Sequence, residues 1–226
     1  MTQMDLIRST YHGRTPGPIN KVHRFAVLIP LIEREDGNVD VLFETRAQEL
    51  DAQPGEICFP GGAMEDEESP LETALRETCE EIGIAADDIE IIGQMDSLNN
   101  AGLQIDVFVG LLKGVTVRGE DRPANGDDSL ANGQTQRFSG LTLSDAEVED
   151  VFTIPLTFFL ENDPEVHYVR MVPDVPADFP YEKVGQGPDY PWRESRYSVL
   201  IYDWPGRYLW GMTAKIVERF AAMLQE

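Results

Sequence analysis

Three glutamates, Glu77, Glu80 and Glu81, have the chemistry and the spacing to bind a divalent cation. They close an acidic stretch, residues 59–84, which reads FPGGAMEDEESPLETALRETCEEIGI. Residues three and four apart are neighbours on a helix, so the three carboxylates would share one face, where like charges cost ~0.2–0.5 kcal/mol per pair. Hard oxygen ligands suit Mg²⁺ or Mn²⁺, which also engage substrate phosphates. The alternative is an acidic helix face that contacts only water.

The same stretch carries the signals of a helix from Pro70 to Ile82. Ser69 is a favoured N-cap residue, Pro70 suits the first helical position, and Glu72 completes a capping box. Gly83 suits the end of the helix. Small or apolar side chains share another face, which is expected to be buried: Leu71, Ala74, Leu75, Thr78 and Ile82.

Apolar runs elsewhere predict the elements that must position this helix. They indicate strands at 21–34, 39–47, 88–95, 103–112, 148–156, 165–172, 196–204 and 208–210. A short helix is expected at 157–162, and a break at the Pro-Gly-Gly sequence 60–62. A closing helix at 211–226 has apolar residues at helical spacing: Met212, Ile216, Val217, Phe220, Met223 and Leu224. This mixture of strands and helices indicates the α/β class.

Length and composition predict one globular domain. The chain has 226 residues, of which 42% are hydrophobic, enough for one well-formed core. We expect an N-terminal leader at 1–22 and a single domain at 23–226, with a polar loop or hairpin insertion around 114–139. The leader has no apolar signal core, and no run of eighteen apolar residues occurs, so secretion and membrane spanning are disfavoured. A cytoplasmic location follows by default.

The charge balance restricts the partners. Eighteen basic residues face 41 acidic ones, giving a formal net charge of -23. Such a surface disfavours nucleic acid and anionic membranes as partners. It also repels phosphorylated substrates at long range, so a nucleotide would need metal ions and local arginines. Two cysteines, Cys58 and Cys79, are too few for a disulfide framework.

The wider spacing of the acidic stretch points to a known family. Gly62, Glu68, Arg76, Gly83 and Ile84 stand at fixed distances from the three glutamates. The arrangement resembles the signature of the Nudix hydrolase superfamily at every charged and glycine position. The resemblance implies a Nudix-type α/β/α sandwich with a mixed β-sheet between helices. It also implies hydrolysis of a nucleoside diphosphate linked to a second group, with Mg²⁺ or Mn²⁺ as the cofactor.

The resemblance also implies roles for individual residues. The metal ligands would be Gly62 (through its carbonyl), Glu68, Glu77, Glu80 and Glu81. Arg76 matches the arginine that orients the carboxylates by ion pairing, although it could serve only as a helix partner of Glu72 or Glu80. Gly61 and Gly62 would let the backbone turn sharply and approach the metal.

A further carboxylate is needed to orient the attacking water or to take its proton. In the superfamily this base lies either in the motif helix or in a later loop. Glu147 and Glu149 stand just before a predicted core strand. We prefer Glu147, while an ordinary surface role remains open for both residues.

The substrate class rests on a second resemblance. Residues 42–62, LFETRAQELDAQPGEICFPGG, resemble the pattern that precedes this signature in coenzyme A pyrophosphatases. The matching positions are Leu42, Arg46, Ala47, Gly55, Phe59, Pro60, Gly61 and Gly62. Residues 147–156 and 208–220 are similar to that family's later strand and final helix. Three positions depart from the pattern: Phe43 replaces a leucine, Glu44 a threonine and Asp51 an arginine.

The implied reaction cleaves coenzyme A, or an acyl or oxidised form, into 3′,5′-ADP and 4′-phosphopantetheine. Arg46 is the best candidate to bind substrate phosphates, because guanidinium binds phosphate bidentately. Its alternative is a surface pair with Glu44 or Glu49. Other arginines could assist (Arg24, Arg170 and Arg196), and four aromatic residues could stack on adenine (Tyr197, Trp204, Tyr208 and Trp210).

Two other functions remain open at this stage. The same fold could cleave ADP-ribose, NADH or a nucleoside triphosphate, and product analysis would separate these from coenzyme A. The domain could also be a catalytically silent binding or regulatory module, although such modules usually lose glutamates that this chain keeps. Many members of the family dimerise, so a homodimer is compatible with the resemblance.

Overall fold

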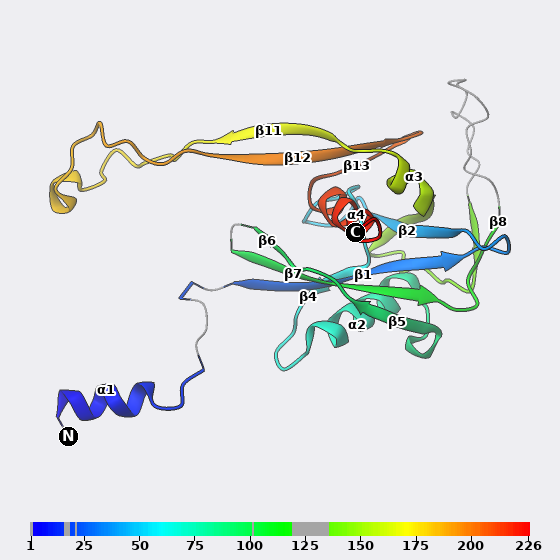
Figure 1. Ribbon diagram of the computed structural model, residues 1–226, viewed down its shortest axis with the longest axis horizontal. Coiled ribbons are helices and arrows are strands. Elements are labelled where there is room, and N and C mark those ends of the chain that lie inside the picture. Colours follow the sequence, from blue (N-terminus) through cyan, green and yellow to red (C-terminus); the bar gives the residue numbers. More distant parts are fainter. Residues whose placement is uncertain (1, 16–18, 21, 101, 119–135) are drawn as a thin grey trace.

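A mixed eight-stranded sheet forms the centre of the molecule (Figure 1). The computed structural model describes residues 2–15, 19–20, 22–100, 102–118 and 136–226. The main strands run in the order β10 (Val148–Pro155), β2 (Val39–Arg46), β1 (His23–Glu33), β7 (Leu103–Leu112) and β5 (Ile89–Gln94). β1 and β7 are parallel, whereas the other neighbours are antiparallel. Three short strands extend the sheet: β3 (Ile57–Cys58) on β2, β4 (Gly61–Ala63) on β1 and β6 (Leu98–Asn100) on β7.

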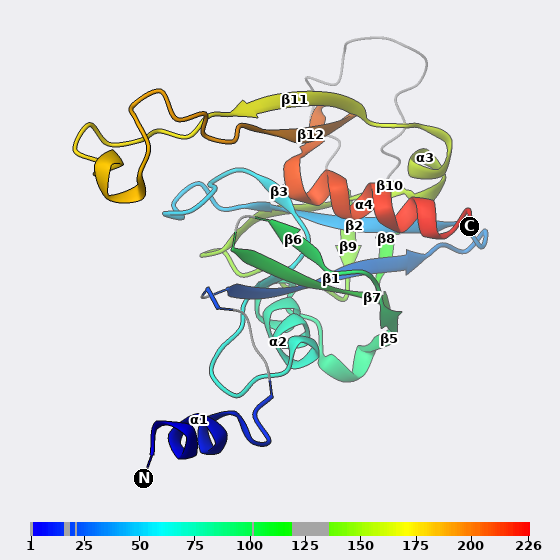
Figure 2. The ribbon, with the colours of Figure 1, turned by 60° about the vertical axis from the view of Figure 1, so that its left-hand side comes forward.

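Helices cover both faces of this sheet, which confirms the predicted α/β/α arrangement (Figure 2). α2 (Pro70–Ile82) lies on one face, over a core that includes Leu28 and Leu42. α3 (Leu156–Glu161) and α4 (Gly211–Met223) lie on the other face, over a core that includes Phe43 and Phe152. Because successive residues of a strand point to opposite faces, Leu42 and Phe43 belong to different cores.

The boundaries of α2 agree with the predicted signals. The Ser69 Oγ accepts a hydrogen bond from the Glu72 N–H at 3.3 Å, and the Glu72 carboxylate accepts one from the Ser69 N–H at 2.8 Å. Gly83 ends the helix in the left-handed conformation, with φ 66°. Local sequence chemistry therefore fixes where the acidic helix begins and ends.

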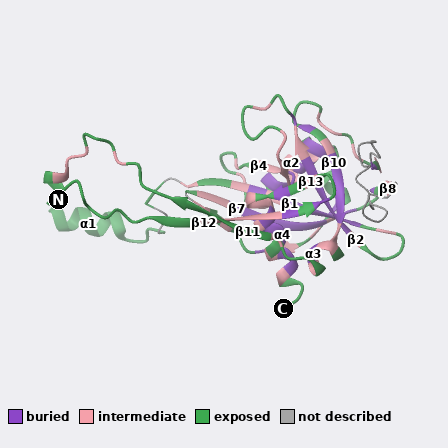
Figure 3. Cartoon of the chain, turned by 90° about the horizontal axis from the view of Figure 1, so that it is seen from above, coloured by how far each residue is buried: buried purple, intermediate pink, exposed green. Residues whose placement is uncertain are grey.

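A hairpin arm extends from the body. β11 (Glu165–Met171) and β12 (Ser195–Trp204) form the arm, and β13 (Arg207–Trp210) pairs with β12. A short 3₁₀ helix, η2 (Tyr181–Val184), lies in the connection between the two long strands, and another, η1 (Ala86–Asp88), precedes β5. All of β11 is exposed, in contrast to the buried strands of the central sheet (Figure 3).

The structure differs from the sequence predictions in three places. Residues 61–63 form strand β4 instead of a break, because their backbone pairs with β1. The last apolar residues of the closing helix, Met223 and Leu224, are exposed, and two alanines, Ala214 and Ala221, are buried in their place. An unpredicted helix, α1 (Gln3–Tyr11), lies in the leader and has no buried residue.

Two short strands, β8 (Thr116–Arg118) and β9 (Arg137–Ser139), pair at the base of the expected polar insertion. The rest of that segment, 119–135, lies outside the described residues, as does Lys21 at the start of the first predicted strand.

Candidate active site

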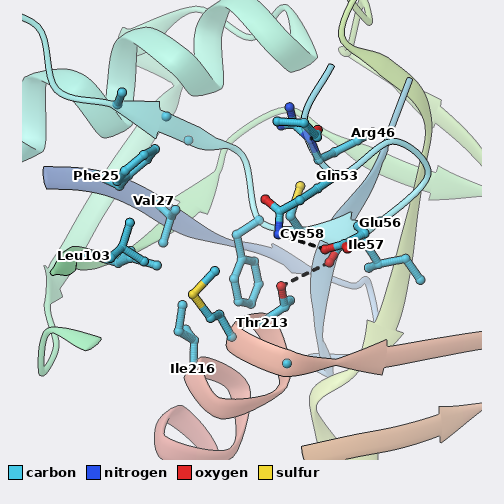
Figure 4. A pocket seen from close by; sticks show the side chains of 18 of the residues that line it. Phe25, Val27, Arg46, Gln53, Glu56, Ile57, Cys58, Leu103, Thr213 and Ile216 are labelled. Atoms are coloured by element: carbon cyan, nitrogen blue, oxygen red, sulfur yellow. Dashed lines mark hydrogen bonds between the residues drawn. The ribbon is translucent and has the colours of Figure 1, made fainter. Parts of the chain in front are cut away.

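A cleft of about 630 Å³ lies beside the short strands β3 and β4 (Figure 4). It joins residues from distant parts of the sequence: Arg46, the two glycines Gly61 and Gly62, Glu77 and Glu81 of α2, and Glu147. Six apolar residues from β1, β7 and α4 also line the cleft, namely Phe25, Val27, Leu103, Ile105, Met212 and Ile216. The cleft therefore combines a charged region with an apolar one.

The Gly61-Gly62 corner can approach α2 closely because neither glycine carries a side chain. A Cβ atom at Gly61, whose φ is +150°, would lie 2.3 Å from the carbonyl oxygen of Ala26. A Cβ atom at Gly62 would lie 2.4 Å from the carboxylate of Glu77. The Gly61 N–H donates a hydrogen bond of 2.8 Å to the Glu81 carboxylate. Glycine is thus required at Gly61, where a Cβ would meet backbone atoms, whereas a Cβ at Gly62 would displace the Glu77 carboxylate.

Arg76 orients the carboxylates at the surface of α2. Its guanidinium donates to Glu68 at 2.7 Å (Nε to Oε1), to Glu77 at 2.9 Å and to Glu80 at 3.1 Å. These hydrogen bonds from Arg76 lower the pKa of Glu68 to about 2. The bridging position fits the predicted orienting role, whereas Glu72 bonds to Ser69 instead.

Glu81 lies deeper than its neighbours, with 4% of its surface exposed. Burial, followed by the nearby charge of Glu44, raises the pKa of Glu81 to about 9. Burial also raises the pKa of Glu77, although the ion pair with Arg76 opposes this. These shifts show that ionised carboxylates are disfavoured here when no cation is near.

The residues present fit a divalent cation. Within the described ranges, no three His, Cys, Asp or Glu side chains already stand in a metal-binding arrangement. Instead, Arg76 draws Glu68, Glu77 and Glu80 together, and Glu81 lies beside them as a buried carboxylate whose ionisation is disfavoured. A hard cation would reduce the repulsion among these negatively charged carboxylates, and carboxylates are the donors that Mg²⁺ and Mn²⁺ prefer.

The structure separates the two candidates for the base. Glu147 lines the cleft and accepts a hydrogen bond from the Ser144 hydroxyl at 3.1 Å. Glu149 accepts a hydrogen bond from Gln48 at 2.8 Å and is not among the cleft residues. The backbone carbonyl of Glu147 also accepts a bond from the Ala47 N–H, which ties this loop to the end of β2.

Arg46 also lies in the cleft, half-buried, and its Nε donates to the carbonyl of Ala52 at 3.3 Å (Figure 4). The other candidate arginines lie elsewhere in the described part of the chain. Arg24 pairs with Asp106 at 2.8 Å, Arg170 pairs with Glu194 on the arm, and Arg196 is not among the cleft residues.

Of the four candidate aromatic residues, two line the cleft and two do not. Tyr197 and Trp210 line the cleft. Trp204 is buried and packs edge-on against Phe158 in the core, so it is not placed to stack on a ligand in the cleft. Tyr208 is 65% exposed and is not among the cleft residues. Sequence spacing could not separate these residues because all four lie on β12 and β13.

Sequence reasoning missed the apolar side of the cleft. Phe25 and Val27 alternate with their neighbours as residues of a core strand do. Met212 and Ile216 are four residues apart, as on the buried face of a core helix. Only the meeting of β1, β7 and α4 makes them surfaces of a cleft (Figure 4). No signal in the sequence distinguishes them from core residues.

The α/β/α sandwich and the acidic helix beside a Pro-Gly-Gly corner are the features expected of the family that the sequence resembles. Comparison with known proteins tests that resemblance. Residues 22–152 match the model of the NUDIX domain. The chain belongs to the Nudix family.

Similar curated proteins include Nudix hydrolase 3 of Caenorhabditis elegans, 32% identical over 158 residues, which are 69% of this chain and 57% of that protein. The peroxisomal coenzyme A diphosphatase NUDT7 of Mus musculus is 30% identical over 160 residues (70% of this chain, 56% of that protein). The peroxisomal coenzyme A diphosphatase ndx-8 of Caenorhabditis elegans is 34% identical over 140 residues (60% and 50%). The chain spans about half the length of these curated relatives.

Among solved structures, a MutT/nudix family protein from Enterococcus faecalis matches with a TM-score of 0.47 and 14% identity, covering 100% of this chain and 71% of that one. No helix in the described part of the chain is both long and apolar enough to span a bilayer.

Proposed function

We propose that this protein is a divalent-cation-dependent pyrophosphohydrolase that cleaves coenzyme A, or its acyl or oxidised derivatives. The products would be 3′,5′-ADP and 4′-phosphopantetheine or its derivative. The observation that carries the proposal is the cleft in which Arg46, Glu147, Glu77 and Glu81 converge beside the Gly61-Gly62 corner.

The cation would be held by Glu77, Glu80 and Glu81, with Glu68 and the Gly62 carbonyl in support. When bound, it would lower the pKa of the attacking water and neutralise charge that develops on the phosphates. Arg76 acts as a positioning residue, because its guanidinium holds Glu68, Glu77 and Glu80 in one arrangement. A lysine would not replace it, since one ammonium cannot present the same planar set of donors.

Two further side chains would act on the substrate itself. Arg46 would bind a phosphate and counter the repulsion of a chain with net charge -23. Glu147 would accept the proton of the attacking water, since it lies in the cleft within the field of Glu77 and Glu81. The Ser144 hydroxyl holds one of the Glu147 oxygens and thus restricts its orientation.

The choice of coenzyme A rests on two supports. The sequence pattern before the acidic helix is similar to that of coenzyme A pyrophosphatases, and two relatives of 30% and 34% identity are named peroxisomal coenzyme A diphosphatases. The departure at Asp51 weighs little against this, because Asp51 is exposed while the next two residues, Ala52 and Gln53, line the cleft.

Turnover of coenzyme A, ADP-ribose and NADH, measured in parallel with millimolar Mg²⁺ or Mn²⁺, tests the proposal. Chromatography should detect 3′,5′-ADP from coenzyme A, and chelation with EDTA should abolish it. Cleavage of ADP-ribose or NADH with coenzyme A untouched would overturn the substrate assignment and keep the reaction. No turnover of any pyrophosphate would overturn both.

A further inference from the structure

Glu44 on strand β2 is a buried acid that the proposed reaction does not use. It is 1% exposed and is not among the cleft residues, although its sheet neighbour Cys58 is. One carboxylate oxygen, Oε1, accepts a weak hydrogen bond from the thiol of Cys58 at 3.3 Å. The other oxygen, Oε2, has no hydrogen-bond partner among the residues that the structure describes. A buried carboxylate oxygen without a partner is rare and needs a physical explanation, of which a bound ion is one.

The alternation of β2 directs this side chain towards the acidic helix. Leu42 belongs to the core beneath α2, and Phe43 belongs to the core on the opposite face. Glu44 and Arg46 have the same parity as Leu42, so they face α2. Arg46 accordingly lines the cleft.

The neighbours of Glu44 belong to the same site. In the sheet, Glu44 is paired with Cys58, which also lines the cleft. The charge of Glu44 acts on Glu81, and the charges of Glu77 and Glu147 act on Glu44. A further carboxylate, Glu44, therefore lies close to the glutamates that would hold the divalent cation.

We propose that Glu44 extends the cation-binding centre from helix α2 onto strand β2. Its free Oε2 and the Glu81 carboxylate face a common divalent cation, which neutralises two buried acids together. This inference rests on the proposed cation dependence and adds a donor at a position where the related pattern has threonine. Because a buried carboxylate contributes full charge to a low-dielectric site, it strengthens binding of the bare ion as well as of an ion carried by substrate.

Titration calorimetry with Mn²⁺ alone, on the metal-free full chain, tests this assignment without any turnover. We expect Glu44→Gln and Glu44→Thr each to raise the Mn²⁺ dissociation constant by about 10–100-fold, the range seen when supporting groups of a metal site are lost. Both variants should melt no lower than the unaltered chain in EDTA, because each removes an unpaired buried acid.

Two controls separate a local donor from a general loss of charge. Asp40→Asn removes a buried acid from the same strand, and Asp40 also has one oxygen without a partner, but its other oxygen is paired with Arg34. Glu149→Gln removes an exposed acid next to Glu147. We expect Mn²⁺ affinity to stay within about twofold of the unaltered chain in both controls.

Unchanged Mn²⁺ binding in the Glu44 variants would overturn the inference. If Glu44→Gln and Glu44→Thr fold and bind Mn²⁺ within twofold of the unaltered chain, Glu44 holds a proton and the inference is wrong. The proposed function would be unaffected, since release of 3′,5′-ADP is measured separately. Conversely, Glu44-dependent Mn²⁺ binding in a chain that cleaves no pyrophosphate would support this inference and overturn the proposed function.

Discussion

Strand β2 buries one acidic side chain near each end, and the two ends are built differently. At one end, Asp40 accepts hydrogen bonds from Arg34 (Nε to Oδ2, 2.7 Å) and from the Thr153 hydroxyl (2.8 Å). At the other end, the one hydrogen bond that Glu44 accepts within the described part of the chain comes from the thiol of Cys58, and burial raises the pKa of Glu44 to about 7. A buried acid with a charged partner is destabilised when that partner is lost, whereas we infer that the partner of Glu44 is a cation that comes from solution.

The same contrast divides the acids around the cleft. Glu68 and Glu80 are bonded to Arg76, and Glu149 is bonded to Gln48. Glu81 is buried, with a single backbone hydrogen bond from Gly61. We therefore expect substitutions of the poorly paired acids to change binding and turnover, and substitutions of the paired structural acid to change stability.

The largest effect is expected for Glu81→Gln. Because the loss of a cation ligand removes several kcal/mol of charge stabilisation from the transition state, turnover of coenzyme A should fall about a thousandfold or more. The melting temperature in EDTA should not fall, since the raised pKa of Glu81 shows that its charge is unfavourable in the folded state. Release of 3′,5′-ADP measures the first effect and thermal unfolding the second. A variant with near-normal turnover would contradict the assignment of Glu81 as a ligand.

A smaller loss is expected for Glu147→Gln. If the carboxylate accepts the proton of the attacking water, turnover should fall about a hundredfold or more, with little change in KM. Glu149→Gln is the matched control and should stay within about threefold, because Glu149 bonds to Gln48 and is not among the cleft residues. Steady-state kinetics of both variants decide this. A few-fold loss in Glu147→Gln would remove this residue from the role of base.

Substitution of Asp40, the paired acid, should lower stability and leave turnover unchanged. Asp40→Asn weakens charge-assisted hydrogen bonds and should lower the free energy of unfolding by about 2 kcal/mol. For a chain of this size, this corresponds to a melting temperature lower by several degrees. Turnover of coenzyme A at a permissive temperature should be unchanged. A large loss of turnover in a folded Asp40→Asn chain would break the proposed contrast between the two ends of β2.

The smallest effect concerns the pH dependence of stability without metal. Folding raises the pKa of Glu44 to about 7 and that of Glu81 to about 9, from 4.5. At pH values between 4.5 and these raised pKa values, the folded chain binds more protons than the unfolded chain. Stability is therefore greatest below pH 4.5, the unfolded pKa, and falls as the pH rises. In EDTA the melting temperature should drop by a few degrees from pH 5 to pH 9.

Glu44→Gln should flatten this pH dependence between pH 5 and pH 8, and millimolar Mn²⁺ should weaken it in the unaltered chain. Differential scanning calorimetry at several pH values measures both. A melting temperature that rises with pH in EDTA would mean that the two acids are not the groups that titrate.

Features that depend on neighbouring residues were predictable from the sequence. The limits of α2 follow from Ser69, Pro70, Glu72 and Gly83, because caps and turns are formed by residues close together in the chain. The strands β1, β2 and β7 follow from apolar runs, since strands buried on both faces need apolar residues over most of their length. The spacing of charged and glycine positions around Glu77 indicated the Nudix family, which the NUDIX-domain match confirms.

Other features depend on which surfaces meet, and these only the tertiary structure decided. Glu147 and Glu149 are equivalent in sequence, but only Glu147 lies among the cleft residues, because the end of β2 holds its loop there. Trp204 and Trp210 are both strand aromatics, yet one packs in the core and the other lines the cleft.

Glu44 gives the clearest case of this difference. The sequence shows an acid in place of a threonine but not whether the acid is paired. Pairing is a property of groups brought together across long sequence separations, here β2, β3 and α2. The sequence by itself determined the acidic helix, the strands and the family. Folding decided that a further carboxylate, Glu44, is buried with one oxygen lacking a partner among the described residues, because burial and charge depend on contacts that the local sequence does not specify.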